Sequence, residues 1–580
     1  MLSCVSAWIL MAALAQAPAA TAPRALLIEN VPADTPVVLS FSTLDKVRAD
    51  LDGMLRAMSP NLAQIGPVLT IQMAQFTAQF GAEAAKTPFT VALELPATDG
   101  DSPTMAILLP IEDYQTFLKS VASGNTEALG NGVDKFKGKL GDMLLAFDGP
   151  GFVVFGNQDA EALIKKIALK PAATIGSKLS AELKAALLGG DFGLYVNMVT
   201  VQDRYKDQIG AMREQIMAAL DQAADQLQQN DQMDQAKKLY GAMFDAANQA
   251  DGLALNFDFD KQALDLSAFL SLRANTPTLA RLKDAKTGTA EGLAKLPPGY
   301  LVYGYLNTDP KTTEGLARMN SGALFPGSGN GNPGAEKYFE AIKELGRQES
   351  LTAMSYGDAV DVIALATPEN AEKSAHAMLD MMKAMTQSPG VKKATVEENV
   401  ENYKGFALNR ANIEFDFQKM LGDQANNPAT AGILRAMLGD QGGMTSYFGT
   451  NGKQLISTTA KNADEAHTKI DRLFDPAAGI GNTPGYQTLR DRLPKETNAL
   501  FALNAQALVR FIGRVIGVAA GGDPIAPAAD MPAEMAMLGG SLATYPTGYR
   551  LDFVIPTAVG PVMEKGLMPM IQGIQGQVNQ

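Results

Sequence analysis

The stretch MLLAFDGPGFVVFGNQDAEALIKKI, residues 143–167, decides how this chain is built. Two apolar runs flank the turn signal DGPG, and an amphipathic run follows polar residues of the kind that begin helices. The pattern predicts a strand, a tight turn, a second strand and a helix. A second copy, MTSYFGTNGKQLISTTAKNADEAHTKI, occupies residues 444–470, and both copies place a Phe (Phe147, Phe448) just before the turn. One small unit is therefore used more than once.

Strand-like openings recur as well. Each consists of a turn signal, a short apolar strand and a polar helix start, and they begin at residues 31, 188, 296 and 493. The first pairs with the third at an offset of 265 (296 − 31), and the second with the fourth at 305 (493 − 188). Because the units follow the same order twice, the sequence predicts an internal duplication, with convergence on a common local motif as the alternative.

These patterns together indicate an α+β fold. Strands joined by tight turns run antiparallel, and amphipathic helices need a sheet to cover. We predict two duplicated lobes, each an antiparallel sheet with helices packed on one face. The first lobe spans residues 31–290 and carries a long helical arm at 203–248, and the second spans residues 291–580.

The beginning of the chain is typical of a secretory signal peptide. In MLSCVSAWILMAALAQA, a short apolar core precedes Ala13-Leu14-Ala15, a small-x-small cleavage signal. We predict a signal peptide at 1–15, a flexible Ala/Pro-rich leader at 16–30, and a mature protein in the periplasm or outside the cell. The apolar core is shorter than the roughly 20 residues of a membrane span, and no later segment is long enough. Cleavage would remove the only Cys (Cys4), which excludes disulfides and thiolate chemistry from the mature chain.

Charge narrows the choice of partner. The formal charge of −13 at pH 7 argues against nucleic acid, because its phosphates repel an acidic surface. We expect a protein or a hydrophobic small molecule as the partner, and no cofactor.

Two helical stretches are the candidate contact surfaces. In the arm and in the run at 508–518, apolar residues recur at three- and four-residue steps, which gives each helix an apolar face. An exposed apolar stripe there would mark an interaction site, and packing against a sheet would exclude one. The candidate contact residues are Ile209, Met212, Ile216, Leu220, Leu508, Phe511 and Val515.

Residues with possible chemistry lack the surroundings that chemistry needs. His376 and His467 each follow a hairpin on a helix, without a motif such as HExxH, and we interpret both as solvent-facing. The methionines of the run MLDMMKAM have the spacing of an apolar helix face, which favours core packing over a Cu(I) site. They are Met378, Met381, Met382 and Met385.

Acidic and glycine-rich segments have similarly simple interpretations. Asn256, Asp258 and Asp260 alternate along a strand, which indicates a solvated outer face leading into a turn rather than a cation site. Asp99-Gly100 is interpreted as a hairpin turn. The loop PGSGNGNPG with Gly327, Gly329 and Gly331 lacks the strand that precedes a phosphate-binding loop, so we interpret it as flexible.

The openings VPADTPVVLSFSTLDKV and LPPGYLVYGYLNTDP, followed by strand pairs and Ala-rich helices, carry a family resemblance. The chain resembles an uncharacterised family of exported bacterial proteins, known only as a domain of unknown function. The resemblance implies a location in the bacterial cell envelope or outside the cell. It brings no catalytic residues with it.

Three hypotheses of function follow. The first is a non-enzymatic envelope protein that binds a protein partner or a hydrophobic ligand through its paired lobes. The second is a hydrolase with dispersed acidic catalytic residues, which predicts a cleft where carboxylates from separate strands converge with perturbed pKa values. The third is a soft-metal (copper) carrier that uses the methionines.

Overall fold

The computed structural model describes residues 21–61, 64, 85–96, 103–227, 237, 240–241, 244–282, 285–319, 333–357, 359–421, 430, 432, 434–435, 438–439, 442–519 and 525–570. The predicted signal peptide, the turn at Asp99-Gly100 and the glycine loop at 327–331 lie outside these residues. The chain divides into two compact units. The first contains the chain up to Asp284 together with Tyr545–Phe553, and the second contains Ala285–Thr544 and the chain from Val554 onwards.

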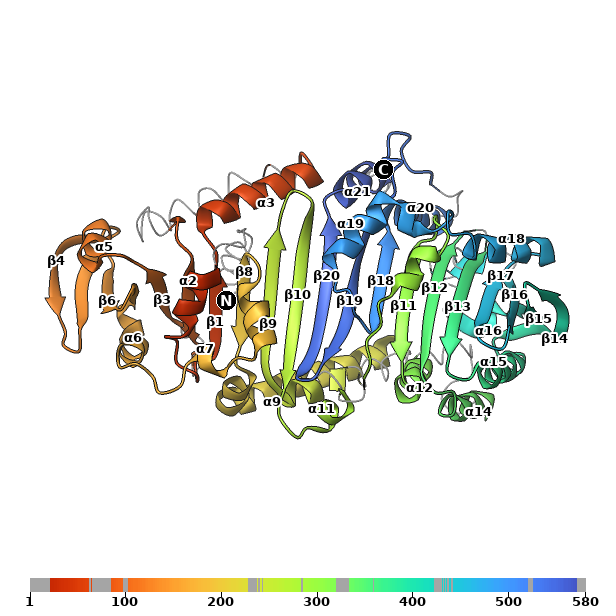
Figure 1. Ribbon diagram of the computed structural model, residues 1–580, viewed down its shortest axis with the longest axis horizontal. Helices are drawn as coiled ribbons and strands as arrows, with labels where there is room; N and C mark the ends of the chain where they lie inside the picture. The colour runs from red at the N-terminus through yellow and green to blue at the C-terminus, as the bar shows by residue number, and fades with distance from the viewer. Residues whose placement is uncertain are drawn as a thin grey trace. The chain divides into compact units, whose positions relative to one another are not determined.

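The first unit is built on an antiparallel sheet in which the order of its own strands is β10-β9-β8-β1-β2-β3-β7-β6-β5-β4 (Figure 1). Its strands are β1 Val37–Phe41, β2 Phe89–Glu94, β3 Thr104–Pro110, β4 Ala122–Ala128, β5 Val133–Gly138, β6 Met143–Gly149, β7 Phe152–Asn157, β8 Phe192–Val196, β9 Ala250–Phe259 and β10 Ala263–Leu272. Its helices are α2 Thr21–Ile28, α3 Leu44–Met58, α5 Tyr114–Val121, α6 Glu161–Ala168, α7 Ile175–Lys178, α8 Ala181–Leu188, α9 Met198–Leu227 and α11 Pro277–Leu282, with a 3-10 turn at Gln158–Ala160.

The second unit has the strand order β19-β18-β11-β12-β13-β17-β16-β15-β14, again antiparallel throughout. Its strands are β11 Val302–Thr308, β12 Gln348–Tyr356, β13 Val360–Pro368, β14 Val391–Tyr403, β15 Phe406–Phe415, β16 Gly443–Thr450, β17 Leu455–Thr459, β18 Ala499–Asn504 and β19 Met537–Tyr545. Its helices are α12 Pro310–Met319, α14 Pro333–Ile342, α15 Ala371–Met385, α16 Phe417–Leu421, α18 Ala463–Leu473, α19 Pro484–Arg492, α20 Ala505–Ala519 and α21 Val559–Gly566, with 3-10 turns at Glu291–Lys295 and Ile480–Asn482.

The last strand, β20 (Gly548–Pro556), lies mostly within the first unit, where it pairs with β10. Leu272 donates its amide hydrogen to the carbonyl oxygen of Thr547 at 2.9 Å, and the rings of Phe269 and Tyr545 meet edge to face at 5.6 Å. A segment from near the end of the chain thus completes the first unit.

The two similar stretches of sequence at residues 143–167 and 444–470 form the predicted elements. Residues 143–167 form β6, β7 and α6, and residues 444–470 form β16, β17 and α18. Gly151 and Gly452 take positive φ angles of 81° and 83° in the two hairpin turns, a conformation that costs glycine little. The α+β class and the antiparallel hairpins are confirmed.

The two units repeat one strand order. In the first unit, neighbouring strands follow the order β9-β8-β1-β2-β3-β7-β6-β5-β4. The second unit has the order β19-β18-β11-β12-β13-β17-β16-β15-β14, in which each strand number is larger by ten. Hydrogen bonds repeat at matching places too. The Asp191 amide donates to Phe257 and the Asp191 side chain accepts from the Phe259 amide, while Asn498 makes the same two bonds with Leu542 and Thr544.

Further along the same strands, Asn197 and Asn504 are equivalent. Each is buried. Its backbone amide donates to the segment before β1 or β11, and its side-chain oxygen accepts a backbone amide from the first turn of the following helix. These bonds fix the correspondence of residues between β8 and β18 at an offset of 307 (504 − 197). Between β1 and β11 the offset is 265 (307 − 42). The Ser42 amide donates to the carbonyl oxygen of Asp191, and the Asn307 amide donates to the carbonyl oxygen of Asn498 in the same way.

The prediction that helices cover one face of the sheet is wrong. In the first unit, α3 and α5 pack on one face in a core that includes Leu39, whereas α6 and α8 pack on the other face with Val38. Successive residues of β1 point to opposite faces, and both are buried because β1 is apolar on both sides. In the second unit, Phe448 packs with α15 and its neighbour Tyr447 with α18.

The flexible leader expected at 16–30 is wrong for its described part. Thr21–Ile28 is helix α2, and Leu27 and Ile28 enter the core beneath it. Arg24 is 1% exposed. It donates to the side chain and backbone oxygens of Ser40 at 2.9 and 3.0 Å, and to the carbonyl oxygens of Leu187 and Gly190. Burial among these acceptors lowers the pKa of Arg24 to about 10.

Candidate functional site

One face of the sheet in the second unit is apolar but not covered like the rest of the core. Along β11 and β18, side chains alternate between buried positions such as Tyr303 and Ala502 and partly exposed positions. On the partly exposed side, Leu306, Phe501 and Leu542 are 38%, 43% and 37% exposed. Large apolar side chains gathered at this exposure are the usual mark of a binding surface.

We call this surface the open face. Its centre consists of three residues from each of three neighbouring strands, which are aligned by their pairing. They are Val302, Gly304 and Leu306 on β11, Ala499, Phe501 and Leu503 on β18, and Leu538, Gly540 and Leu542 on β19. On the far side of β11, Thr352 and Met354 of β12 continue the face, because they pair with Gly304 and Val302.

Three of the matching positions in the first unit carry larger side chains. Gly304 corresponds to Leu39, Ala499 to Phe192, and Gly540 to Leu255, by the hydrogen-bond equivalence described above. Leu39 and Phe192 are only 5% exposed and belong to the core beneath α3. The first unit therefore fills with its own side chains the space that the second unit leaves open.

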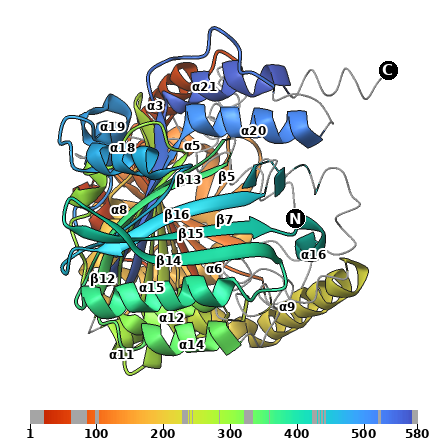
Figure 2. The same cartoon turned by 90° about the vertical axis from the view of Figure 1, so that its right-hand side faces the viewer.

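Helices border the open face at one end of its strands. Leu538 packs against the small core of α20 and α21, and the ring of Phe511 on α20 lies 5.1 Å from that of Tyr356 at the end of β12. Figures 1 and 2 show α20 and α21 at this end of the strands and α12 and α14 at the opposite end.

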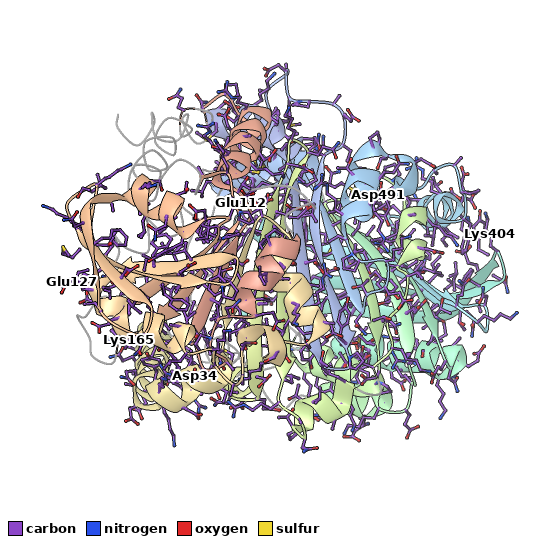
Figure 3. All side chains as sticks on the ribbon, turned by 60° about the vertical axis from the view of Figure 1, so that its left-hand side comes forward. Asp34, Glu112, Glu127, Lys165, Lys404 and Asp491 are labelled. Atoms are coloured by element: carbon purple, nitrogen blue, oxygen red, sulfur yellow. The ribbon has the colours of Figure 1, made fainter. Side chains whose placement is uncertain are left out.

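The open face is free of charge. None of the eleven described side chains that form it is acidic or basic. Exposed charges lie elsewhere on the units, for example Glu112, Glu127 and Asp34 on the first and Lys404 and Asp491 on the second (Figure 3). A surface without charge or fixed hydrogen-bonding groups favours contact with hydrocarbon.

The sequence placed its contact residues on helices rather than on this sheet. On α20, Leu508, Phe511 and Val515 are all half-buried, and Phe511 stands at the border of the open face. The sheet positions were missed because strands β11 and β18 read as ordinary apolar strands. The available signal was the glycine or alanine at positions where the first unit has leucine or phenylalanine.

The contact residues predicted in the arm belong to the first unit, whereas the open face belongs to the second. Helix α9 begins at Met198, is interrupted by non-helical angles at Tyr205, and is described to Leu227. Ile209, Ile216 and Leu220 are half-buried, whereas Met212 is 49% exposed. Before the interruption, hydrogen bonds from the side chain of Gln202 and to it from Arg273 tie the helix to the unit.

Carboxylates do converge in the first unit, but the central one, Asp191, has no contact with solvent. Asp191 at the start of β8 is fully buried, and one of its oxygens accepts the Phe259 amide at 3.0 Å. Burial and the neighbouring charge of Asp258 raise the pKa of Asp191 to about 9, so its carboxyl group is protonated at pH 7. Lys46 on α3 lies nearby and pairs with Asp50 at 3.6 Å.

This group differs from the open acidic cleft that the hydrolase hypothesis requires. Asn498 makes the same two backbone bonds in the second unit with an uncharged amide. The repeated geometry gives Asp191 a structural part, which is to join the start of β8 to β9.

The two histidines and the methionine run lie in different surroundings. His376 is exposed on α15, as expected. His467 is not simply solvent-facing: its ring stacks on Tyr403 at 3.8 Å and its Nε2 lies 3.0 Å from Glu401. Met381, Met382 and Met385 are buried in the core between α14 and α15, with Met378 packed against it.

The expectation of a solvated outer face at 256–260 is wrong for Asn256, which is 8% exposed. Helices cover the face of β9 to which it points. Asp260 does form the predicted turn, and its side chain accepts the amides of Gln262 and Ala263 at 2.6 and 2.8 Å.

Comparison of the chain with models of known protein families, with curated proteins and with solved structures finds no match. None of the helices in the described ranges combines the length and the apolar character that a bilayer crossing requires. The same ranges contain no group of three or more His, Cys, Asp or Glu side chains placed to hold a metal ion.

Proposed function

We propose that this chain is an exported, non-enzymatic binding protein that holds a hydrophobic ligand against the open face of its second unit. The observation that supports this most directly is the exposure of Leu306, Phe501 and Leu542 on an uncharged sheet face. Export rests on the signal-peptide pattern at residues 1–15 and on the family resemblance.

We also infer that the two units arose by duplication. The repeated strand order and the equivalent pairs Asp191/Asn498 and Asn197/Asn504 support a common origin better than convergence does. Under this proposal, the first copy keeps a closed core at the positions where the second copy binds its ligand.

Binding is tested with a neutral apolar fluorophore, Nile red, titrated into the purified protein. The double variant Leu306→Glu/Leu542→Glu places two charges on the open face at positions already more than a third exposed. Because an apolar ligand would then have to desolvate these carboxylates, we expect affinity to fall at least tenfold.

The matched control is Leu140→Glu. Leu140 is 58% exposed in the turn between β5 and β6 of the first unit, so the same chemical change is made outside the open face. The proposal predicts unchanged binding by this variant. Equal affinity of the wild type and the double variant would contradict it.

A further inference from the structure

The chemistry of the open face distinguishes between its possible occupants. A protein partner in a standard interface makes about one hydrogen bond per 100–200 Å² of buried surface. The hydrogen-bonding groups on this side of the sheet are few: the hydroxyl group of Thr352, and at the edge of the open face that of Ser350, which pairs with Leu306. A hydrocarbon chain needs none, so the face fits hydrocarbon better than it fits polypeptide.

The shape of the face points the same way. A Cβ atom added at Gly304 would meet no atom within 4 Å, so there is open space directly above β11. The neighbouring Ala499 leaves more space, because the first unit has Phe192 at that position. The open face therefore lacks large side chains at Gly304 and Ala499, close to Phe501, at positions where the first unit packs its own core.

The width of the face suits a long chain. From β12 to β19 it crosses four strands, which at about 4.8 Å between neighbours spans about 14 Å. The acyl chains of one bilayer leaflet extend about 15 Å, half of a hydrocarbon core of about 30 Å.

We propose that the ligand is a lipid whose acyl chain lies across the open face, over Gly304 and beside Phe501. This inference rests on the proposed function, since it names the chemical class of the ligand at the same site. The chain takes the place that Leu39 and Phe192 occupy in the first unit.

Chain length is the first test. Hexadecanoate and octanoate, each below its micelle-forming concentration, are titrated against the wild type by displacement of Nile red. Each additional buried methylene tightens binding about fourfold. We expect hexadecanoate to bind at least 100-fold more tightly than octanoate, and equal affinity for the two would overturn the proposal.

The second test adds side chains at Gly304 and Ala499 without changing the apolar character of the open face. Gly304→Leu and Gly304→Leu/Ala499→Phe introduce side chains present at the equivalent positions of the first unit. We expect hexadecanoate affinity to fall at least tenfold in both variants. Gly124→Leu is the matched control, because a Cβ there also meets nothing within 4 Å and Gly124 lies on β4, outside the open face.

The outcomes separate the two proposals. If the filled variants bind hexadecanoate as the wild type does while Leu306→Glu/Leu542→Glu does not, the acyl position is wrong and the binding face stands. If all these variants bind like the wild type, both proposals fail. Melting temperatures identify any variant that fails to fold, and Gly304→Leu alone, which has room for its side chain, keeps the test decisive if the double variant does not fold.

Discussion

The carboxyl group of Asp191 and the side-chain amide of Asn498 have the same structural role, which is to accept a hydrogen bond from the backbone of the neighbouring strand. Both side chains accept a backbone amide from the neighbouring strand. Asp191 is fully buried and lacks the solvent that an ionised carboxylate requires. At Asp191, burial and the charge of Asp258 keep the proton on the acid. An aspartate here is a pH-dependent substitute for asparagine.

Replacement of Asp191 by Asn is therefore expected to flatten the dependence of stability on pH. With its pKa raised from 3.8 to about 9, folded Asp191 keeps a proton that the unfolded chain loses above about pH 4. Stability then falls as pH rises from about 4 to about 9, by at most about 1.4 kcal/mol per pH unit. Urea unfolding at pH 5, 7 and 9 should show a smaller loss of stability in Asp191→Asn than in the wild type.

The exposed carboxylate of Asp491 provides the control for this comparison. Asp491→Asn is expected to keep the pH dependence of the wild type. If Asp191→Asn loses stability with pH as steeply as the wild type does, the assignment of a proton to Asp191 is contradicted.

At the scale of elements, apolar hairpins were predictable and polar ones were not. Strands β6 and β7 are apolar runs on either side of a glycine turn, so the sequence predicts them correctly. Strand β4 reads ASGNTEA and β14 reads VKKATVEENVENY, and neither pattern predicts a strand. Both lie at the ends of their unit's strand order and are mostly exposed, so pairing with β5 and β15 rather than burial holds them in place.

The open face was hidden for a related reason. A half-covered strand and a fully covered strand both read as apolar, and β11 and β18 do not differ from core strands in composition. Only the comparison of equivalent positions in the two units, such as Gly304 with Leu39, separates them. The sequence predicts the fold class, whereas the register that aligns equivalent strands of the two units comes from the backbone hydrogen bonds.

The start of α20 gives a prediction at this scale. Asn504 is 2% exposed, and its side-chain oxygen accepts the backbone amide of Ala507 at 3.2 Å. Asn197, the residue before α9, accepts the backbone amide of Thr200 in the same way. Asn504→Ala leaves this buried amide without its partner, and we expect a loss of about 1–2 kcal/mol in the free energy of unfolding. Chemical denaturation measures it, and Asn504→Ser, which keeps an oxygen acceptor without adding a charge at a buried position, should lose less. An equal loss in both variants would show that the cap is not the cause.

At the scale of the whole chain, the first unit depends on residues more than 270 positions away in sequence, since Leu272 bonds to Thr547 (547 − 272 = 275). Tyr545–Phe553 belong to this unit, and β20 pairs with β10 there. No local pattern predicts this, because hairpin and helix signals report only on neighbours along the chain. The unit is therefore incomplete until the C-terminal part of the chain is present.

Gly548 tests this dependence. A Cβ at this position would run into the backbone of β10 at Leu270 and Ser271. We expect Gly548→Val to separate β20 from β10 and to destabilise the protein by about 1–3 kcal/mol, because a strand backbone cannot move aside as a flexible side chain can. Hydrogen exchange should then speed up at the amides of Leu264–Leu272, which lie in the first unit although the substitution is near the C-terminus.

The control for Gly548→Val is Gly124→Val on β4, where the added side chain meets nothing within 4 Å. It should leave exchange along β10 unchanged. The amides of β14, β15 and β16 report on the second unit in the same experiment. If they lose protection as much as β10 does in Gly548→Val, the effect is global and the first unit does not depend specifically on β20. If β10 alone loses protection, a chain that ends before Tyr545 cannot complete its first unit.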